Sequence, residues 1–176
     1  RAGAGSGADR KLFSEVRGDT MYFPLYVDLT EKNILFAGGG KIAARRVHIL
    51  MRFAKHITVV APRFEESFGE LEEESQIRLV QRTFDFSVLI GRDLVFAATD
   101  DTELNRQIYE ACKEQGIPVN VCSDQNLCDF QFPSVVISDD VVIGINASGK
   151  NHRRVKQVRQ ELEKYQTGDS CSLYRQ

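Results

Sequence analysis

Residues 34–43 have the sequence Ile-Leu-Phe-Ala-Gly-Gly-Gly-Lys-Ile-Ala, and this stretch decides the fold. A short apolar run ends at three glycines, and a segment with helical spacing of apolar residues follows directly. The glycines and Ala43 fit the pattern G-x-G-x-x-A. In that pattern the first glycine permits a tight turn, the second admits a pyrophosphate, and the alanine lets the helix pack closely on the strand. Free N–H groups at the helix start attract phosphate, so the stretch predicts a dinucleotide site.

The same alternation continues outward from this stretch. Further apolar runs at 57–60, 77–80, 94–98 and 119–121 are expected to be buried strands, and 65–74 a helix. Asp100 with Glu103 forms a predicted capping box for a helix that runs to Lys113 and ends near Gly116. The first helix carries Arg45, Arg46 and His48 largely off its apolar face. Strands that alternate with helices predict an α/β fold, a Rossmann-like doubly wound parallel sheet, over residues 21–132.

The pattern changes after Pro133. Residues 135–138 and 141–145 are expected to form a hairpin around Asp139-Asp140, followed by a helix over about 152–165. A hairpin and one helix bury little surface alone, so they pack on the first domain or on the same piece of a second subunit, and we favour the second option. The segment 133–166 is therefore a predicted small α+β dimerisation and substrate segment. Residues 1–20 are expected to be a flexible leader or linker, and 167–176 a frayed tail.

Composition excludes several classes of protein. A net charge of −2 argues against binding nucleic acid or an anionic membrane, and no apolar run is long enough to span a bilayer. With no secretory signal in residues 1–20, we expect a cytoplasmic protein with free thiols. Cys122 and Cys128 lack a zinc spacing and the histidines are isolated, so no metal site is expected.

The end of the second strand lacks the acid that usually binds the ribose 2′-hydroxyl. The chain there has Ala61-Pro62-Arg63, which leaves NAD and NADP both open, and Arg63 is able to meet a 2′-phosphate. Thr99-Asp100 follows the fourth strand at the same edge of the sheet. These two residues are expected near the adenosine half of the cofactor.

In combination and order, several motifs resemble those of the precorrin-2 dehydrogenases, a family that includes the N-terminal module of sirohaem synthase. The match covers roughly residues 21–160. Its motifs are Phe23-Pro24-Leu25, residues 38–46, Thr58-Val59-Val60-Ala61-Pro62, residues 97–101 with Leu104-Asn105, Val119-Asn120-Val121, Cys128-Asp129-Phe130, Phe132-Pro133 and Ser148-Gly149-Lys150. The resemblance implies NAD-dependent oxidation of precorrin-2 to sirohydrochlorin, towards sirohaem or cobalamin. It also implies a homodimer with an exchanged C-terminal segment, and some members also act as ferrochelatases.

The resemblance and the residues together give a candidate cofactor site. Family members contact the cofactor at positions that match Lys41, Ile42, Pro62 and Arg63, and they use NAD despite the missing acid. The turn and the fourth strand add the remaining candidates, which are Gly38, Gly40, Thr99 and Asp100.

Precorrin-2 carries eight carboxylates, so its pocket is expected to be positive. Residues 148–160 contain five cations and no acid, and arginine binds carboxylates with two parallel hydrogen bonds. The alternative is a solvated helix face. Asn120 and Asp129 are expected to border the same cleft, or to be structural. The candidate substrate residues are Asn120, Asp129, Lys150, His152, Arg153 and Arg154.

Two departures from the family pattern bear on activity. The family's catalytic aspartate lies three residues after the asparagine of an N-V-x-D segment, where this chain has Ser123, followed by Asp124. Either the loop shifts so that Asp124 accepts the proton, or general-base help is weak or dispensable, because a serine hydroxyl without a base only hydrogen-bonds. The alternative is that Asp124 is simply a turn residue. One helix follows the hairpin, so uroporphyrinogen methylation is not expected. The rival hypotheses are a bifunctional dehydrogenase and chelatase, and a non-catalytic NAD(H)-sensing module.

Overall fold

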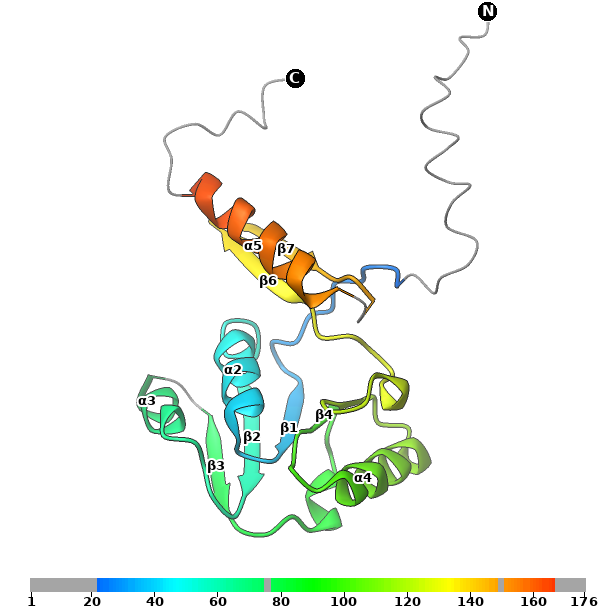
Figure 1. Ribbon diagram of the computed structural model, residues 1–176. Coiled ribbons are helices and arrows are strands. Elements are labelled where there is room, and N and C mark those ends of the chain that lie inside the picture. Colours follow the sequence, from blue (N-terminus) through cyan, green and yellow to red (C-terminus); the bar gives the residue numbers. More distant parts are fainter. Residues whose placement is uncertain (1–21, 75–76, 149–150, 167–176) are drawn as a thin grey trace, which may run out of the picture. The chain divides into compact units, whose positions relative to one another are not determined.

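The computed structural model describes residues 22–74, 77–148 and 151–166 (Figure 1). The expected leader over 1–20, the expected tail over 167–176 and the candidate Lys150 lie outside these residues. The chain divides into two units. One runs from Tyr26 to Val135, the other contains the residues from Val136 onward together with those before Tyr26, and each is described here by itself.

The first unit is built on five parallel strands in the order β3-β2-β1-β4-β5. The central strand β1 (Asn33–Ala37) pairs with β2 (His56–Ala61) on one side and with β4 (Leu94–Ala97) on the other. The outer strands are β3 (Arg78–Gln81) and β5 (Val119–Val121). The strand order reverses beside β1, and in such sheets ligands bind at the carboxyl ends of the strands at this point. The predicted doubly wound sheet is confirmed.

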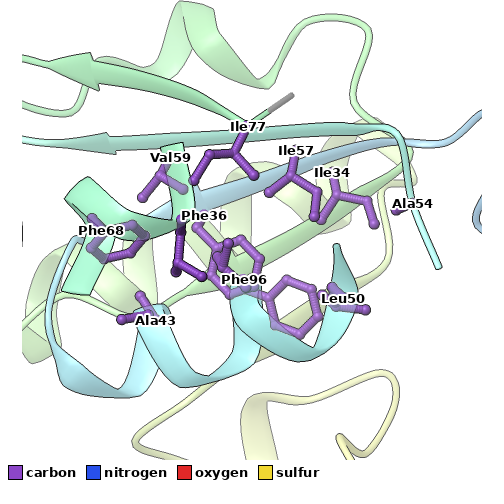
Figure 2. Packing of buried hydrophobic residues seen from close by; sticks show 13 residues of the cluster. Ile34, Phe36, Ala43, Leu50, Ala54, Ile57, Val59, Phe68, Ile77 and Phe96 are labelled. Carbon is purple, nitrogen blue, oxygen red and sulfur yellow. The ribbon is translucent and has the colours of Figure 1, made fainter. Parts of the chain in front are cut away.

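Helices cover both faces of the sheet. One core combines β1 and β2 side chains with α2 (Lys41–Leu50) and α3 (Ser67–Glu74), and Figure 2 shows Phe36 and Phe96 inside it. These two rings are stacked with their centroids 4.4 Å apart. The core on the other face contains Ile108 and Cys112 of α4 (Thr102–Gln115). Continuous apolar strands arise because both faces are buried.

Local details differ from the predicted elements. Asp101, not Asp100, caps α4, because the Asp101 carboxylate accepts the N–H groups of Glu103 and Leu104. The predicted end at Gly116 is confirmed, since Gly116 has the left-handed conformation (φ +69°) that favours glycine. Two short 3₁₀ helices, η1 (Phe86–Leu89) and η2 (Gln125–Leu127), have too few residues to show a periodicity and were not predicted.

The second unit has the predicted hairpin and helix. Strand β6 (Ser134–Ser138) pairs with β7 (Val141–Ile145), and Asp139 takes a positive φ of 50° in the turn between them. Helix α5 (His152–Gln166) packs against β7. Within residues 22–74, 77–148 and 151–166, none of the helices is long and apolar enough to cross a membrane.

Candidate functional site

The glycine turn fits tightly between the ends of β4 and β2. Gly38 has φ +111°, and a Cβ there would lie 2.3 Å from the carbonyl oxygen of Ala98. A Cβ on Gly39 would lie 2.6 Å from the carbonyl oxygen of Arg63. Both positions therefore need glycine because neighbouring backbone occupies the space. The candidates Gly38, Arg63 and Thr99, which directly follows Ala98, are thus brought together at one edge of the sheet.

Gly40 is different, because its surroundings are open. Its φ of −83° suits any residue, and a Cβ there would meet no atom within 4 Å. Gly40 is also the N-cap of α2, with no side-chain cap and no acid in the first turn. The first backbone bond of the helix runs from Ala44 N to Gly40 O, so the N–H groups of residues 41–43 have no helical acceptor. An open space in front of such groups fits the pyrophosphate of a dinucleotide.

A carboxylate that no sequence motif indicates, that of Glu65, lies beside this turn. Glu65 N donates to Gly39 O at 2.8 Å, and Glu65 Oε1 lies 3.9 Å from Lys41 Nζ. Pro62 and Arg63 are exposed at the end of β2, as expected of cofactor contacts. The acid that usually follows the second strand is missing at Ala61-Pro62-Arg63, and Glu65, four residues beyond Ala61, is a carboxylate that the fold brings back to the glycine turn. Only the fold reveals this proximity, because nothing in the spacing predicts the backbone bond to Gly39.

The ends of β4 and β5 are joined by a buried amide. Asn105 is 1% exposed, and its Oδ1 accepts from Thr99 N at 3.2 Å and from Thr99 Oγ1 at 2.7 Å. Its Nδ2 donates to Thr99 O at 3.0 Å and lies 3.5 Å from Ser123 Oγ. Asp100 is exposed beside this group. Asn105 therefore fixes the spacing between Thr99 and the loop after β5.

The two candidate catalytic residues lie in this loop. Ser123 is exposed and its Oγ is the acceptor for Asn105. Asp124 is half-buried and caps η2, with Oδ1 accepting from Asn126 N at 2.9 Å and from Asn126 Nδ2 at 3.1 Å. The other carboxylate oxygen of Asp124 has no hydrogen bond among the described residues. A capping role and a proton-accepting role are thus compatible in the same side chain.

The structure does not bring Asp129 to the glycine turn. Its Oδ1 pairs with Lys113 Nζ at 2.7 Å and its Oδ2 accepts from Val119 N at 3.1 Å, at the amino end of β5. The glycine turn lies at the carboxyl end of the strands. The chain reverses after η2 and runs antiparallel to β5, with Asn120 opposite Cys128. Asp129 therefore lies at the amino edge of the sheet, opposite the edge that carries the glycine turn. Both carboxylate oxygens of Asp129 are used by Lys113 and by the N–H of Val119, which favours the alternative that Asp129 is structural.

Asn120 is buried in the middle of β5 and both ends of its amide are occupied. Nδ2 donates to Phe130 O at 2.8 Å, and Oδ1 accepts from Arg46 Nη1 at 2.6 Å. Arg46 was predicted to lie largely off the packed face of α2, but it is half-buried and reaches across to β5. Its position borders the buried residues of the helix, and a long side chain there is able to turn inward. Burial lowers the pKa of Arg46 from its ordinary value.

Two cysteines lie next to this arginine. Arg46 Nη1 also donates to Cys122 Sγ at 2.8 Å, and Cys128 Sγ donates to the carbonyls of Val121 and Asp124. Burial raises the pKa of both thiols. Cys128 packs against the core on the α4 face of the sheet, whereas Cys122 is a hydrogen-bond acceptor. Nowhere in the described ranges do three or more histidine, cysteine or acidic side chains gather as metal ligands.

The remaining substrate candidates lie on the second unit. His152, Arg153 and Arg154 are exposed in the first turn of α5, which Asn151 caps by accepting from Arg154 N at 2.9 Å. Arg159, one turn further on, pairs with Glu163 at 2.6 Å. The first turn of this helix therefore presents two exposed arginines without an acid in that turn.

Comparisons with known proteins agree with this geometry. The chain is 39% identical over 142 residues to "Siroheme synthase" of Pseudoalteromonas atlantica, covering 81% of this chain and 31% of the relative. It is 38% identical over 146 residues to "Siroheme synthase" of Nitrosospira multiformis, covering 81% and 31%. These relatives confirm the resemblance inferred from the motifs. The chain spans less than a third of their length.

The fold also matches a solved structure described as "SirC, precorrin-2 dehydrogenase". The TM-score is 0.68 with 23% sequence identity, and the match covers 83% of this chain and 74% of that one, which confirms the fold. A family model described as "Putative NAD(P)-binding" matches residues 25–134, which include the whole parallel sheet and its glycine turn. The chain therefore belongs to this family of NAD(P)-binding domains.

Proposed function

We propose that the protein oxidises precorrin-2 to sirohydrochlorin with NAD as the hydride acceptor. The observation that carries the proposal is the open space at Gly40, in front of a helix start without a cap or an acid. The names of the sirohaem synthase relatives and of the fold neighbour support this substrate. The proposed NAD-binding domain covers residues 21–132, and the segment 133–166 serves dimerisation and the substrate.

The proposal favours NAD over NADP because of Glu65. Its carboxylate lies 3.9 Å from the ammonium group of Lys41 and next to Gly39, so it offsets positive charge where the adenosine ribose is expected. A carboxylate accepts a hydrogen bond from a ribose hydroxyl and repels a 2′-phosphate. In this proposal Glu65 binds the ribose 2′-hydroxyl, in place of the acid that usually follows the second strand and is missing after β2.

Each part of the chain has a defined task in the proposed reaction. The N–H groups at the start of α2 bind the pyrophosphate, and Asn105 holds Thr99 and Ser123 at the spacing that the cofactor needs. When bound, NAD supplies the acceptor for the hydride, while the protein orients the reactants. Asp124 accepts the proton that leaves the macrocycle, through the carboxylate oxygen that does not cap η2. Ser123 positions this loop through Asn105.

The substrate's carboxylates are matched by cations on the second unit. Arg153, Arg154 and His152 form an exposed group at the start of α5, where an anion is also favoured by the helix dipole. We include in the proposal a homodimer in which the segment 133–166 is exchanged between subunits. Light scattering tests the dimer, and a mass of one chain would contradict it.

The decisive experiment is an anaerobic incubation of the protein with NAD and precorrin-2. We expect NADH and sirohydrochlorin to form together in equal amounts, as a hydride transfer with loss of one proton requires. The matched control is an Asp124→Asn variant, which keeps an oxygen to cap η2 but lacks the base. If no NADH forms above the rate without protein, while NAD still binds, the protein is a cofactor-sensing module and not a dehydrogenase.

A further inference from the structure

The guanidinium group of Arg46 is hydrogen-bonded through Nη1, while Nε and Nη2 have no acceptor among the described residues. The two hydrogens of Nη1 are used, one by Asn120 Oδ1 at 2.6 Å and one by Cys122 Sγ at 2.8 Å. The guanidinium group has five N–H donors, so Nε and Nη2 retain three. None of these has an acceptor among the described residues. Neither atom is completely buried, because among those residues Gln131 Nε2 is the one fully buried side-chain nitrogen or oxygen without a partner.

The charge of Arg46 has no anionic partner in the part of the chain that the structure describes. Its guanidinium carbon lies 5.0 Å from the centre of the Phe132 ring and 5.8 Å from that of Phe96. The polar neighbours, Asn120 and Cys122, are neutral. A half-buried cation between aromatic rings is weakly solvated, and a charge-assisted hydrogen bond to it is stronger than one in water. The surroundings thus favour an anion at the open edge of this side chain.

Arg46 lies too far from the glycine turn to bind the pyrophosphate of the cofactor. Arg46 lies six residues beyond Gly40, about 9 Å along α2 from the helix start. Its acceptor Cys122 lies in the same row of the sheet as Ala98 and Gly38, two strands from the glycine turn, or about 10 Å. The Nη1 end of the guanidinium therefore lies against the carboxyl half of β5, where Cys122 is followed directly by Ser123 and Asp124, the residues of the proposed chemistry.

We propose that Arg46 binds a carboxylate of the substrate through Nε and Nη2, in a side-on contact with two parallel hydrogen bonds. Nη1 is fixed by β5, so the open pair of donors is oriented before the substrate arrives. Arginine suits this task because Nε and Nη2 lie in one plane and match the two oxygens of a carboxylate. The identity of the carboxylate as one of those on precorrin-2 rests on the proposed function. The contact would anchor the macrocycle beside Asp124.

The test is an equilibrium titration that requires no turnover. Sirohydrochlorin, which carries the same carboxylates as the substrate, is titrated anaerobically into wild-type protein, Arg46→Gln and Arg46→Lys, and NAD is titrated separately. We expect the Kd of Arg46→Gln for sirohydrochlorin to rise about 10- to 100-fold, as loss of hydrogen bonds between charged groups implies. The Kd for NAD should stay within about twofold. Arg46→Lys should be intermediate, because lysine keeps the charge but not the paired donors.

The matched control is Arg45→Gln, which removes the same charge from the exposed neighbouring position and should change neither Kd. An unchanged Kd for sirohydrochlorin, or an equal loss of affinity for both ligands, would overturn the proposal. If Arg46→Gln does not fold, Arg46→Lys decides, and unchanged binding in that variant overturns it. A protein that binds sirohydrochlorin through Arg46 but forms no NADH would refute the dehydrogenase and leave this inference standing.

Discussion

Thr99 Oγ1 donates a hydrogen bond of 2.7 Å to Asn105 Oδ1, and this pair joins the end of β4 to the first turn of α4. The same amide oxygen accepts from Thr99 N, and the amide nitrogen donates back to Thr99 O. One buried side chain therefore satisfies three groups of one residue at the carboxyl edge of the sheet. This exchange of hydrogen bonds adds to the apolar packing that holds β4 and α4 together at the edge with the candidate site.

Replacing Asn105 with Leu should destabilise the protein. Leucine has a similar volume but no acceptor or donor, so the N–H and C=O groups of Thr99 lose their Asn105 partner, while the Thr99 hydroxyl can still donate to Asp101 O at 3.0 Å. The expected decrease in the free energy of unfolding is about 2–3 kcal/mol, since each unsatisfied group costs about 1–3 kcal/mol. Urea unfolding measures it. Thr99→Val, which removes only the hydroxyl, is the control with a smaller loss, and equal stability of Asn105→Leu and the wild type would contradict the role of the amide.

Gly40→Ala should lose NAD without losing stability. Its Cβ meets no protein atom within 4 Å, so the unfolding free energy should change by less than about 1 kcal/mol. The same Cβ occupies the space expected for the pyrophosphate. The Kd for NAD should therefore rise about tenfold or more, as a steric cost of about 1–3 kcal/mol implies. Calorimetric titration with NAD checks this, and an unchanged Kd would place the pyrophosphate elsewhere.

Gly38→Ala should have the opposite effect. The added Cβ would lie 2.3 Å from Ala98 O at a φ of +111°, so the unfolding free energy should fall by about 2–4 kcal/mol. Gly69→Ala is the matched control, because Gly69 lies in α3 with open space at its Cβ position. Alanine there should raise stability by up to about 1 kcal/mol and leave NAD binding unchanged. Similar stability of the Gly38 and Gly69 variants would show that the turn is not tightly fitted.

Asp101→Ala should remove the N-cap of α4. The Asp101 carboxylate accepts two backbone N–H groups, and loss of such a cap costs about 0.5–2 kcal/mol. Asp100→Ala should change the unfolding free energy by less than about 0.5 kcal/mol, since Asp100 is exposed and does not cap the helix. Thermal unfolding of both variants distinguishes them. A larger loss at Asp100 would favour the capping box expected from the sequence.

The N-cap of α4 is Asp101, one residue beyond the predicted Asp100, and this difference separates what sequence patterns predict well from what they predict poorly. The alternation of apolar runs and helical segments predicted the parallel sheet, because burial on both faces imposes it over many residues. A cap depends on the backbone angles of one residue, and two adjacent aspartates fit the same pattern. The glycine turn was predictable because its residues are consecutive in the sequence. The structure adds the distances to neighbouring backbone atoms, which explain why Gly38 and Gly39 must be glycine.

The parts of the site that were not predicted depend on contacts across the sheet. Arg46 reaches β5 from a helix position that periodicity places at the border of the apolar face. Glu65 joins the turn through a backbone bond to Gly39. Asp129 was expected at the cleft, but the antiparallel return beside β5 takes it to the other edge. In each case the position of the residue depends on a contact between segments that are distant in the sequence, and local sequence patterns do not encode such contacts.

Asp124→Asn should separate catalysis from structure. The amide oxygen is able to accept the N–H of Asn126, so the cap of η2 and the stability should persist. If Asp124 is the base, kcat should fall about 100-fold or more, while the KM for precorrin-2 changes little. Ser123→Ala, which removes only the 3.5 Å contact with Asn105 that positions the loop, should lower kcat much less than Asp124→Asn. A larger fall in Ser123→Ala than in Asp124→Asn would assign the main role to the serine.

The Cys112 thiol should make the protein less stable in alkali. Burial, and then the nearby Asp129 charge, raise the pKa of Cys112 from 9.0 to about 12. The folded state thus keeps a proton that the unfolded state releases above pH 9, so stability falls between pH 9 and 12. In urea unfolding, the advantage of wild type over Cys112→Ala should shrink by about 2 kcal/mol from pH 8 to pH 10.5. The same difference at both pH values would contradict this burial effect.

The three adjacent glycines also have a consequence for natural variants of this protein. A cell that carries a substitution at Gly38 would make a chain that unfolds and is degraded, and its level would drop. A substitution at Gly40 would leave a folded chain at normal abundance that lacks its cofactor. Two glycines separated by one residue would thus fail in different ways, Gly38 through loss of folded protein and Gly40 through loss of cofactor binding.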